Sequence, residues 1–318
     1  MDSSSQELTG LGLSSIPIAP EGFRSGFVGI VGRPNVGKST LMNQLVGQKI
    51  AITSPVAQTT RNRLRGILTT PTAQIIFVDT PGIHKPHHEL GKVLVQNARM
   101  AISSVDLTLF VVDGSVPAGR GDRFIADLLT TSSNPVVIGM NKLDQQSPDA
   151  AADIAQSYQE LAKLGDWPVL KFSALTGEGL DALQTALVDR LETGPYYYPP
   201  DLATDQPERF IMGELIREQI LLLTREEVPH SVAIAIDRVE EEETITRILA
   251  TVHVERSSQK GILIGKGGGM LKAIGTAARQ QIQKLIAGKV YLELFVKVQP
   301  KWRQSRTRLA DLGYRVEK

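Results

Sequence analysis

The feature that most constrains this chain is the stretch GRPNVGKS at residues 32–39, which fits the phosphate-binding pattern G-x-x-x-x-G-K-[ST]. A β-like run at residues 26–31 precedes it, and a helix-compatible run at residues 39–45 follows it. Glycines allow a tight turn whose backbone N–H groups point at an anion, and the helix N-terminus adds partial positive charge. Lys38 can reach the β- and γ-phosphates, and the Ser39 hydroxyl can ligate Mg²⁺. A glycine-rich turn that matches by chance is the alternative.

Length and composition restrict the class of protein. The 318 residues suggest about two domains, and the hydrophobic content of 42% is ordinary for a globular core. A net charge of +1 indicates nothing about partners, and the absence of cysteine excludes disulfides, zinc–thiolate sites and thiol catalysis. We find no apolar run that could span a bilayer and no secretion signal, so we expect a cytoplasmic protein whose residues 1–24 form a flexible tail.

A polar segment at residues 53–63 has no apolar period and indicates a long loop. A loop that follows a phosphate-loop helix is a candidate switch, in which one threonine would meet Mg²⁺ when the γ-phosphate is present. After two strand-like runs between residues 64 and 78 comes Asp79-Thr80-Pro81-Gly82. From this position the Asp79 carboxylate can hold Mg²⁺ through its water shell, and the Gly82 N–H can donate to a γ-phosphate.

Continuous apolar runs at residues 107–112 and 135–140 alternate with helical segments, which indicates a parallel sheet covered on both faces. We expect helices at residues 89–103, 148–164 and 179–191. The second run ends in Asn141-Lys142-Leu143-Asp144, at the strand end where doubly wound sheets bind ligands. The Asp144 carboxylate can accept from the N1–H and the exocyclic amine of guanine, which adenine cannot supply. Lys142 would pack along the base, and Asn141 would tie this loop to the phosphate loop.

A short strand at residues 169–172 leads into the small-residue loop Ser173-Ala174-Leu175. In this loop the Ala174 N–H can meet the guanine carbonyl oxygen. For the stretch Asn141–Asp144, the alternative is a polar turn after a strand, without a ligand.

In this order, five stretches resemble the five motifs of the translation-factor-like GTPases. They are residues 32–39, Thr60, residues 79–82, residues 141–144 and residues 173–175. The resemblance implies GTP rather than ATP, and it aligns Thr60 rather than Thr59 with the Mg²⁺-binding threonine of the first switch. Ile83 stands where Ras-like GTPases carry a glutamine, which is similar to the TrmE–Era branch. In that branch an asparagine at the position of Asn35 is associated with K⁺ beside the phosphates, so the resemblance implies slow hydrolysis that K⁺ stimulates.

The residues and the resemblance together predict a GTP site with Mg²⁺. Catalytic roles are expected for Lys38, Thr60 and Asn35, and metal contacts are expected from Ser39, Thr60 and Asp79. The expected nucleotide contacts are Gly32, Arg33, Pro34, Asn35, Val36, Gly37, Lys38, Ser39, Thr40, Asp79, Thr80, Pro81, Gly82, Asn141, Lys142, Asp144, Ser173, Ala174 and Leu175.

The stretch GPYYYPP at residues 194–200 breaks every period and indicates a domain boundary. Its tyrosines are expected to pack at the domain interface rather than to stack on bases. We therefore expect a GTPase domain at residues 25–193, a linker at 194–206, a second domain at 207–302 and a basic C-terminal segment at 303–318.

The second domain shows a helix, two strands, the pattern G-x-x-G at Gly265–Gly268, a further helix and a strand. A glycine loop with a lysine at a helix N-terminus lets a sugar-phosphate backbone approach, and Ile262 and Ile264 could floor a groove for bases. The order resembles a type II KH domain, which binds single-stranded RNA; a second nucleotide site is the alternative. The tail interleaves cations with Trp302, which suits phosphate contact and stacking, although a solvated helix or a lipid-contacting surface would look alike. The expected RNA contacts are Ile262, Ile264, Gly265, Lys266, Gly267, Gly268, Lys272, Lys301, Arg303 and Arg306.

Over nearly its whole length the chain resembles the Era family of bacterial ribosome-assembly GTPases. The resemblance implies an α/β P-loop GTPase domain with a mostly parallel sheet and helices on both faces, followed by an α+β type II KH domain. It implies GTP hydrolysis, binding near the 3′ end of small-subunit ribosomal RNA, assistance to small-subunit biogenesis and peripheral contact with anionic membrane at its cytoplasmic face. We expect a monomer. A P-loop small-molecule kinase and an RNA-binding protein with a vestigial nucleotide site are the other classes.

The base-reading role of Asp144 gives a first prediction. Replacing Asp144 with Asn removes the acceptor for the guanine N1–H, so the variant should bind GTP more weakly and shift its selectivity towards xanthine nucleotides. Competition between GDP and XDP for the protein measures this shift. An unchanged preference for guanine would contradict the assignment.

Overall fold

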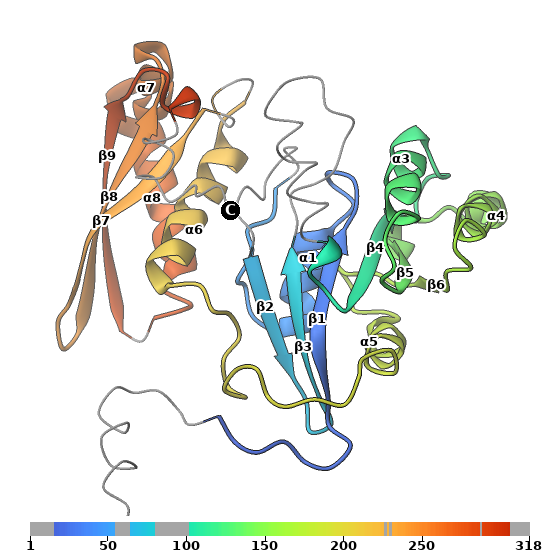
Figure 1. The fold of residues 1–318 in the computed structure, drawn as a ribbon. Helices are drawn as coiled ribbons and strands as arrows, with labels where there is room; N and C mark the ends of the chain where they lie inside the picture. The colour runs from blue at the N-terminus through green and yellow to red at the C-terminus, as the bar shows by residue number, and fades with distance from the viewer. Residues whose placement is uncertain are drawn as a thin grey trace, which may run out of the picture. The chain divides into compact units, whose positions relative to one another are not determined.

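A computed structural model describes the protein at residues 16–54, 64–79, 102–225, 228, 231–286 and 288–305. Within it the chain divides into two compact units. The first comprises Met1–Ile50 and Arg63–Asp205, and the second comprises Ala51–Asn62 and Gln206–Lys318. Each unit has its own sheet (Figure 1).

The first unit is built on a six-stranded sheet in the order β2-β3-β1-β4-β5-β6, in which all neighbours pair in parallel except β2 and β3. Its strands are β1 (Arg24–Val31), β2 (Leu64–Thr69), β3 (Ala73–Asp79), β4 (Leu107–Asp113), β5 (Val136–Asn141) and β6 (Val169–Lys171). Every residue of β3 and β5 is buried. This burial explains why these strands appear in the sequence as continuous apolar runs rather than as alternating ones.

Helices cover this sheet, and they are α1 (Lys38–Val46), α3 (Arg120–Leu129), α4 (Ala151–Ala162) and α5 (Leu180–Val188). Helices α3 and α4 share one core with β4 and β5, to which Phe110, Ile138, Ile125 and Tyr158 contribute. The predicted helices around residues 39–45, 148–164 and 179–191 correspond to α1, α4 and α5.

Helix α3 was not anticipated from the sequence. It begins in the glycine-rich stretch Gly119-Arg120-Gly121, and glycine opposes helix formation. The side chain of Asp122 compensates, because its Oδ2 accepts the Gly119 N–H at 2.9 Å and so satisfies a donor at the helix start. The helix expected at residues 89–103 lies almost entirely outside the described residues.

The segment expected as a linker packs on the first unit. The Tyr196 ring centroid lies 4.4 Å from that of Phe23, and the backbone N–H groups of Tyr197 and Tyr198 donate to Gln74 Oε1 at 2.8 and 3.0 Å. The Tyr198 hydroxyl donates to Asp205. The first unit therefore includes the chain as far as Asp205.

The second unit has a three-stranded sheet in the order β7-β8-β9, in which β7 and β8 are antiparallel and β8 and β9 are parallel. Helices α6 and α8 pack on one another and on this sheet (Figure 1). The elements are α6 (Glu208–Leu223), β7 (Ala233–Glu241), β8 (Ile245–Val254), α7 (Ser257–Ile264), α8 (Gly269–Ile282) and β9 (Lys289–Val298). The predicted type II KH order is thus present, with one additional helix, α7.

Helix α7 was missed because eight residues give too short a run for a 3.6-residue period to stand out. Its start is defined by Gln259, whose Oε1 accepts the N–H groups of Glu255 and Arg256 at 2.9 and 3.0 Å. Ile262 and Ile264 therefore lie on a helix.

The interpretation of Trp302 as a stacking residue is wrong. Its side chain is only 2% exposed, and its Nε1 donates to the Ser231 carbonyl oxygen at 3.0 Å. Trp302 thus belongs to the core of the second unit, because a buried indole needs a partner for its N–H.

Candidate functional site

The phosphate loop connects β1 to α1, and its backbone is shaped by two residues in the left-handed region. These are Asn35, at φ 63°, and Gly37, at φ 97°, which is the N-cap of α1. Neighbouring groups exclude a side chain at both motif glycines. A Cβ on Gly32 would lie 2.3 Å from the Val111 carbonyl oxygen, and one on Gly37 would lie 2.2 Å from Asn141 Nδ2.

Lys38 is held over this loop. Its Nζ donates to the carbonyl oxygens of Gly32 and Arg33 at 3.1 and 2.9 Å, and the residue is 7% exposed. Burial lowers the pKa of the Lys38 ammonium to about 8, although the Asp79 carboxylate opposes this change. A phosphate bound in the loop would supply the negative charge that this buried ammonium needs.

The predicted Mg²⁺ contacts Ser39 and Asp79 lie together. Ser39 Oγ donates to Asp79 Oδ2 at 3.3 Å, and Asp79 is fully buried at the end of β3. A hydroxyl and a carboxylate are oxygen ligands of the kind that Mg²⁺ prefers, so these residues fit the ion. Thr60, Thr80, Pro81 and Gly82 lie outside the described residues.

The base-side loops meet the phosphate loop through Asn141. Its Nδ2 donates to the Val36 carbonyl oxygen at 2.8 Å, which is the link that the sequence predicted. Its Oδ1 accepts the Ala174 N–H, also at 2.8 Å, and Ser173 Oγ donates to Asp144 Oδ1 at 2.5 Å. The Ala174 N–H was expected to meet the guanine carbonyl, and in the structure it has Asn141 as its partner.

Two acidic residues at this site were missed from the sequence. The side chain of Arg33, a predicted nucleotide-contacting residue of the phosphate loop, donates from Nε to Asp122 Oδ1 at 2.7 Å. Asp113 Oδ2 accepts from Lys142 Nζ at 2.6 Å. The sequence did offer a positional signal for Asp113. This residue ends β4, just as Asp79 ends β3 and Asn141 ends β5.

The second candidate site is the G-x-x-G loop between α7 and α8. Gly265, Gly267 and Gly268 have φ values of 69°, 59° and 78°, in the left-handed region that favours glycine. A Cβ on Gly267 or Gly268 would meet no atom within 4 Å. The loop therefore projects into open space, where a polymer backbone can approach it.

A cavity of about 470 Å³ adjoins the G-x-x-G loop between α8 and the edge strand β9. Lys272 and Arg279 supply positive charge, and Leu294 of β9 lies beside Gly275 of α8. The lining residues are Gly268, Leu271, Lys272, Gly275, Thr276, Arg279, Tyr291, Leu292, Glu293 and Leu294. Of these, only Gly268 and Lys272 were predicted from the sequence, because the groove depends on how α8 meets β9.

Several other predicted RNA-contacting residues do not line this cavity. Ile262 is 47% exposed on α7, and neither it nor Ile264 lines this cavity. Arg303 pairs with Glu255, which precedes α7, whereas the G-x-x-G loop follows that helix. Lys301 is exposed, and Arg306 lies outside the described residues.

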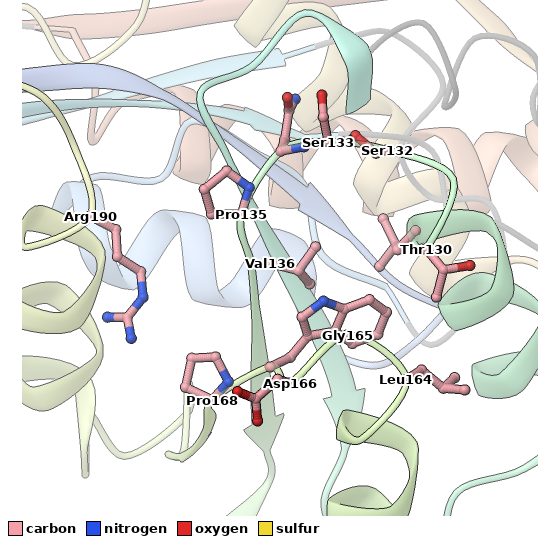
Figure 2. A pocket seen from close by; sticks show the side chains of 13 residues that line it. Thr130, Ser132, Ser133, Pro135, Val136, Leu164, Gly165, Asp166, Pro168 and Arg190 are labelled. Carbon is pink, nitrogen blue, oxygen red and sulfur yellow. Dashed lines mark hydrogen bonds between the residues drawn. The ribbon is translucent and has the colours of Figure 1, made fainter.

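A second cavity, of about 480 Å³, lies in the first unit where β5 and β6 begin, at the opposite strand ends from the phosphate loop. Figure 2 shows its hydroxyl-bearing residues, among them Thr130 and Ser132, together with Arg190. The Arg190 guanidinium donates to the Ala186 carbonyl oxygen at 2.8 Å. Asn134 donates to the carbonyl oxygens of Ile102 and Val105, each at 2.7 Å. These contacts join elements of the fold, and we assign no chemistry to this cavity.

The described ranges contain no cluster of potential metal-ligating acidic or histidine side chains and no helix that could cross a membrane. Their acidic and histidine side chains form no group of three that could hold a metal ion. None of the helices placed there is long and apolar enough to cross a membrane.

Comparison with known protein families gives two matches. The family described as 50S ribosome-binding GTPase matches residues 27–142, and the KH domain family matches residues 227–303. GTPase Era of Nostoc sp. is 78% identical over 303 residues, which is 95% of this chain and 93% of that protein. GTPase Era of Rippkaea orientalis is 70% identical over 312 residues, 98% of this chain and 99% of that one.

Two solved structures are similar over 92% of this chain and 100% of their own. One is Era in complex with MgGDPNP and nucleotides 1506–1542 of 16S ribosomal RNA, with 38% identity and a TM-score of 0.87. The other is an Aquifex aeolicus Era variant bound to GDP·AlF4⁻, with 37% identity and a TM-score of 0.86.

The lowered pKa of Lys38 predicts proton uptake on nucleotide binding. With a pKa of about 8, about three quarters of Lys38 is neutral at pH 8.5 and about a quarter at pH 7.5. Bound phosphate favours the charged amine and raises its pKa, so binding should take up protons at pH 8.5 and fewer at pH 7.5. Calorimetry of GDP binding in two buffers of different ionisation enthalpy measures this uptake. Buffer-independent heats at pH 8.5 would contradict the prediction.

Proposed function

Because this chain belongs to the Era family of GTPases, we propose that it uses GTP binding and hydrolysis to control its binding to small-subunit ribosomal RNA near the 3′ end, and that it thereby assists assembly of the small subunit. The chain hydrolyses GTP to GDP and phosphate, as its family does. One observation carries the proposal: a single chain contains two sites. In the first, a phosphate loop is hydrogen-bonded to a guanine-type base loop, and in the second, a G-x-x-G loop lies beside a cationic groove. The ATP-dependent kinase alternative lacks such support, because Asp144 and its partner Ser173 belong to the guanine-reading motif.

In the nucleotide half, Mg²⁺ would be held by Ser39 and Asp79 and would neutralise charge on the phosphate oxygens. Lys38 would bind the β- and γ-phosphates from its position over the loop. The structures of Era with MgGDPNP and with GDP·AlF4⁻ support this arrangement.

In the RNA half, the open G-x-x-G loop would approach the RNA backbone, and Lys266, Lys272 and Arg279 would contact phosphates. Exposed base edges would lie in the groove along β9. The similar Era structure that holds nucleotides 1506–1542 of 16S ribosomal RNA supports this target.

A contact of α6 supports control of the RNA half by the nucleotide. Residues Ala51–Asn62 belong to the second unit, although they connect α1 and β2 of the first. Glu218 of α6, which is 1% exposed, accepts from the Thr53 N–H at 2.8 Å and from its hydroxyl at 3.3 Å. The chain that leads to Thr60 therefore starts at the first helix of the RNA-binding unit, where a nucleotide-dependent change can be passed on.

Several finer points belong to the same proposal. The protein would be a cytoplasmic monomer, and its basic C-terminal segment would contact anionic membrane peripherally. K⁺ would bind near Asn35, which is exposed in the phosphate loop at φ 63°.

The RNA half generates a prediction. Changing Lys266 and Lys272 together to Glu should weaken binding of single-stranded RNA about tenfold or more and reduce the slope of log K against log salt by about 1.4, the value for two phosphate contacts. GDP affinity should stay unchanged. Fluorescence titration of labelled RNA at several salt concentrations measures both quantities.

A matched control is Lys163→Glu with Arg190→Glu, which reverses two exposed charges of the first unit. This control should bind RNA nearly as the unchanged protein does. Equal losses in both double variants would refute the groove as the RNA site.

The K⁺ proposal is tested by turnover. GTP hydrolysis should be faster in K⁺ than in Na⁺ buffer of equal ionic strength, and Asn35→Ala should abolish the difference while GDP still binds. Equal turnover of the unchanged protein in the two buffers would count against a K⁺ site.

A further inference from the structure

We propose that Arg33 and Asp113 are positioning residues of the nucleotide site. Arg33 places the phosphate-binding Lys38, and Asp113 places the base-side Lys142. Both are held by one shared buried support. The support consists of Asp122 on α3 and Tyr158 on α4. This inference rests on the guanine-nucleotide site described above and assigns roles to side chains that the motifs leave open.

The first part of the support is Asp122, which anchors the Arg33 side chain to α3 through an ion pair. Arg33 Nε lies 2.7 Å from Asp122 Oδ1, and Asp122 is fully buried. Gly121 makes room for this side chain, because a Cβ there would lie 2.6 Å from Arg33 Cδ. Burial acts to lower the pKa of the Arg33 guanidinium, but Asp122 raises it overall, so the pair is ionic.

This ion pair acts on Lys38 through the Arg33 backbone. The carbonyl oxygen of Arg33 accepts from Lys38 Nζ at 2.9 Å, the shorter of the two bonds that hold this amine. Arg33 lies in a loop without regular structure, so its side-chain anchor restricts where that carbonyl can lie. Loss of the anchor would let the loop and the lysine move away from the phosphates.

The second part of the support positions Lys142. Asp113 Oδ2 accepts from Lys142 Nζ at 2.6 Å, while its Oδ1 accepts from the Ser115 N–H at 3.0 Å and the Ser115 hydroxyl at 2.5 Å. Burial acts to raise the pKa of the Asp113 carboxyl, but Lys142 and Ser115 lower it overall, which keeps the carboxylate charged. Lys142 itself has φ 71°, so its backbone also holds an uncommon conformation.

Tyr158 connects the two parts. Its side chain is fully buried, and its hydroxyl donates to the Asp113 carbonyl oxygen at 2.9 Å. The pKa of this hydroxyl is raised overall. Burial is the largest cause, the charges of Asp122 and Asp113 act in the same direction, and Arg33 acts to lower the pKa. The Tyr158 side chain also packs in the same core as Ile125 and Ala126 of α3, the helix that carries Asp122. Support for the phosphate side and the base side therefore comes from one polar network beneath the site.

The test compares Asp113→Asn, Tyr158→Phe and Arg33→Met with the unchanged protein. Hydrogen bonds to charged groups are worth enough to change a binding constant about tenfold. Asp113→Asn should therefore raise the Kd for GDP and the KM for GTP about tenfold and leave kcat at saturating GTP within about twofold. Tyr158→Phe should produce a smaller change in the same direction. Arg33→Met should raise Kd and also lower kcat, because Lys38 reaches the reacting phosphate.

The matched control is the ion pair Arg123–Asp127 on the same helix α3, whose side chains are each 57% exposed. Its double replacement by Met and Asn should leave Kd, KM and kcat unchanged. Thermal unfolding of each variant, followed in parallel, separates positioning from folding.

The outcomes separate this inference from the proposed function. If the unchanged protein binds no GDP, the nucleotide function itself fails. If it binds GDP and Asp113→Asn and Tyr158→Phe bind equally well, the role of Asp113 is refuted, and if Arg33→Met keeps the Kd and kcat of the unchanged protein, the role of Arg33 is refuted. The GTPase assignment stands in both cases. A loss of binding that appears only with loss of folded protein would also refute them.

Discussion

The Asn141 side chain makes the interaction on which the nucleotide site depends. Its amide donates to the Val36 carbonyl oxygen in the phosphate loop and accepts from the Ala174 N–H in the base loop. The parallel register places these loops at one edge of the sheet, but register alone does not hold a loop in place. Gly37 is required for the same reason, because Asn141 Nδ2 occupies the position of any Cβ there. One buried amide thus determines a loop shape and joins two halves of a site.

In both units a glycine in the left-handed conformation precedes the helix at the proposed ligand site, although the ligands differ in size. Both α1 and α8 begin after a left-handed glycine, Gly37 at φ 97° and Gly268 at φ 78°. Around Gly37 the space is filled, which suits a small ligand of fixed shape. Around Gly268 it is open, and a groove continues along α8 and β9, which suits a polymer backbone that must enter and leave. Glu218 connects the RNA-binding unit to the start of the segment that contains Thr60.

Local sequence signals were sufficient for most elements of the fold and for the loops of the nucleotide site. The buried strands were found because parallel strands are apolar throughout, and Asn141 was recognised because its motif ends such a strand. Helices α3 and α7 were missed since one starts among glycines and the other has eight residues. Asp113 has only a positional signal, the end of a buried strand, and Asp122 has no local signal, because its importance arises only when α3 meets the phosphate loop. Trp302 was misinterpreted because its neighbours in sequence are cations, whereas in the structure its side chain is buried and its Nε1 donates to the Ser231 carbonyl oxygen.

We propose that nucleotide state controls RNA binding through the chain between α1 and β2. The most direct measurement titrates labelled single-stranded RNA from the 3′ end of small-subunit ribosomal RNA into the protein without nucleotide, with GDP and with a non-hydrolysable GTP analogue. We expect the tightest binding with the analogue, and we expect Glu218→Ala to reduce the difference between nucleotide states. Equal affinity in all three states would contradict this control and would leave two independent modules on one chain.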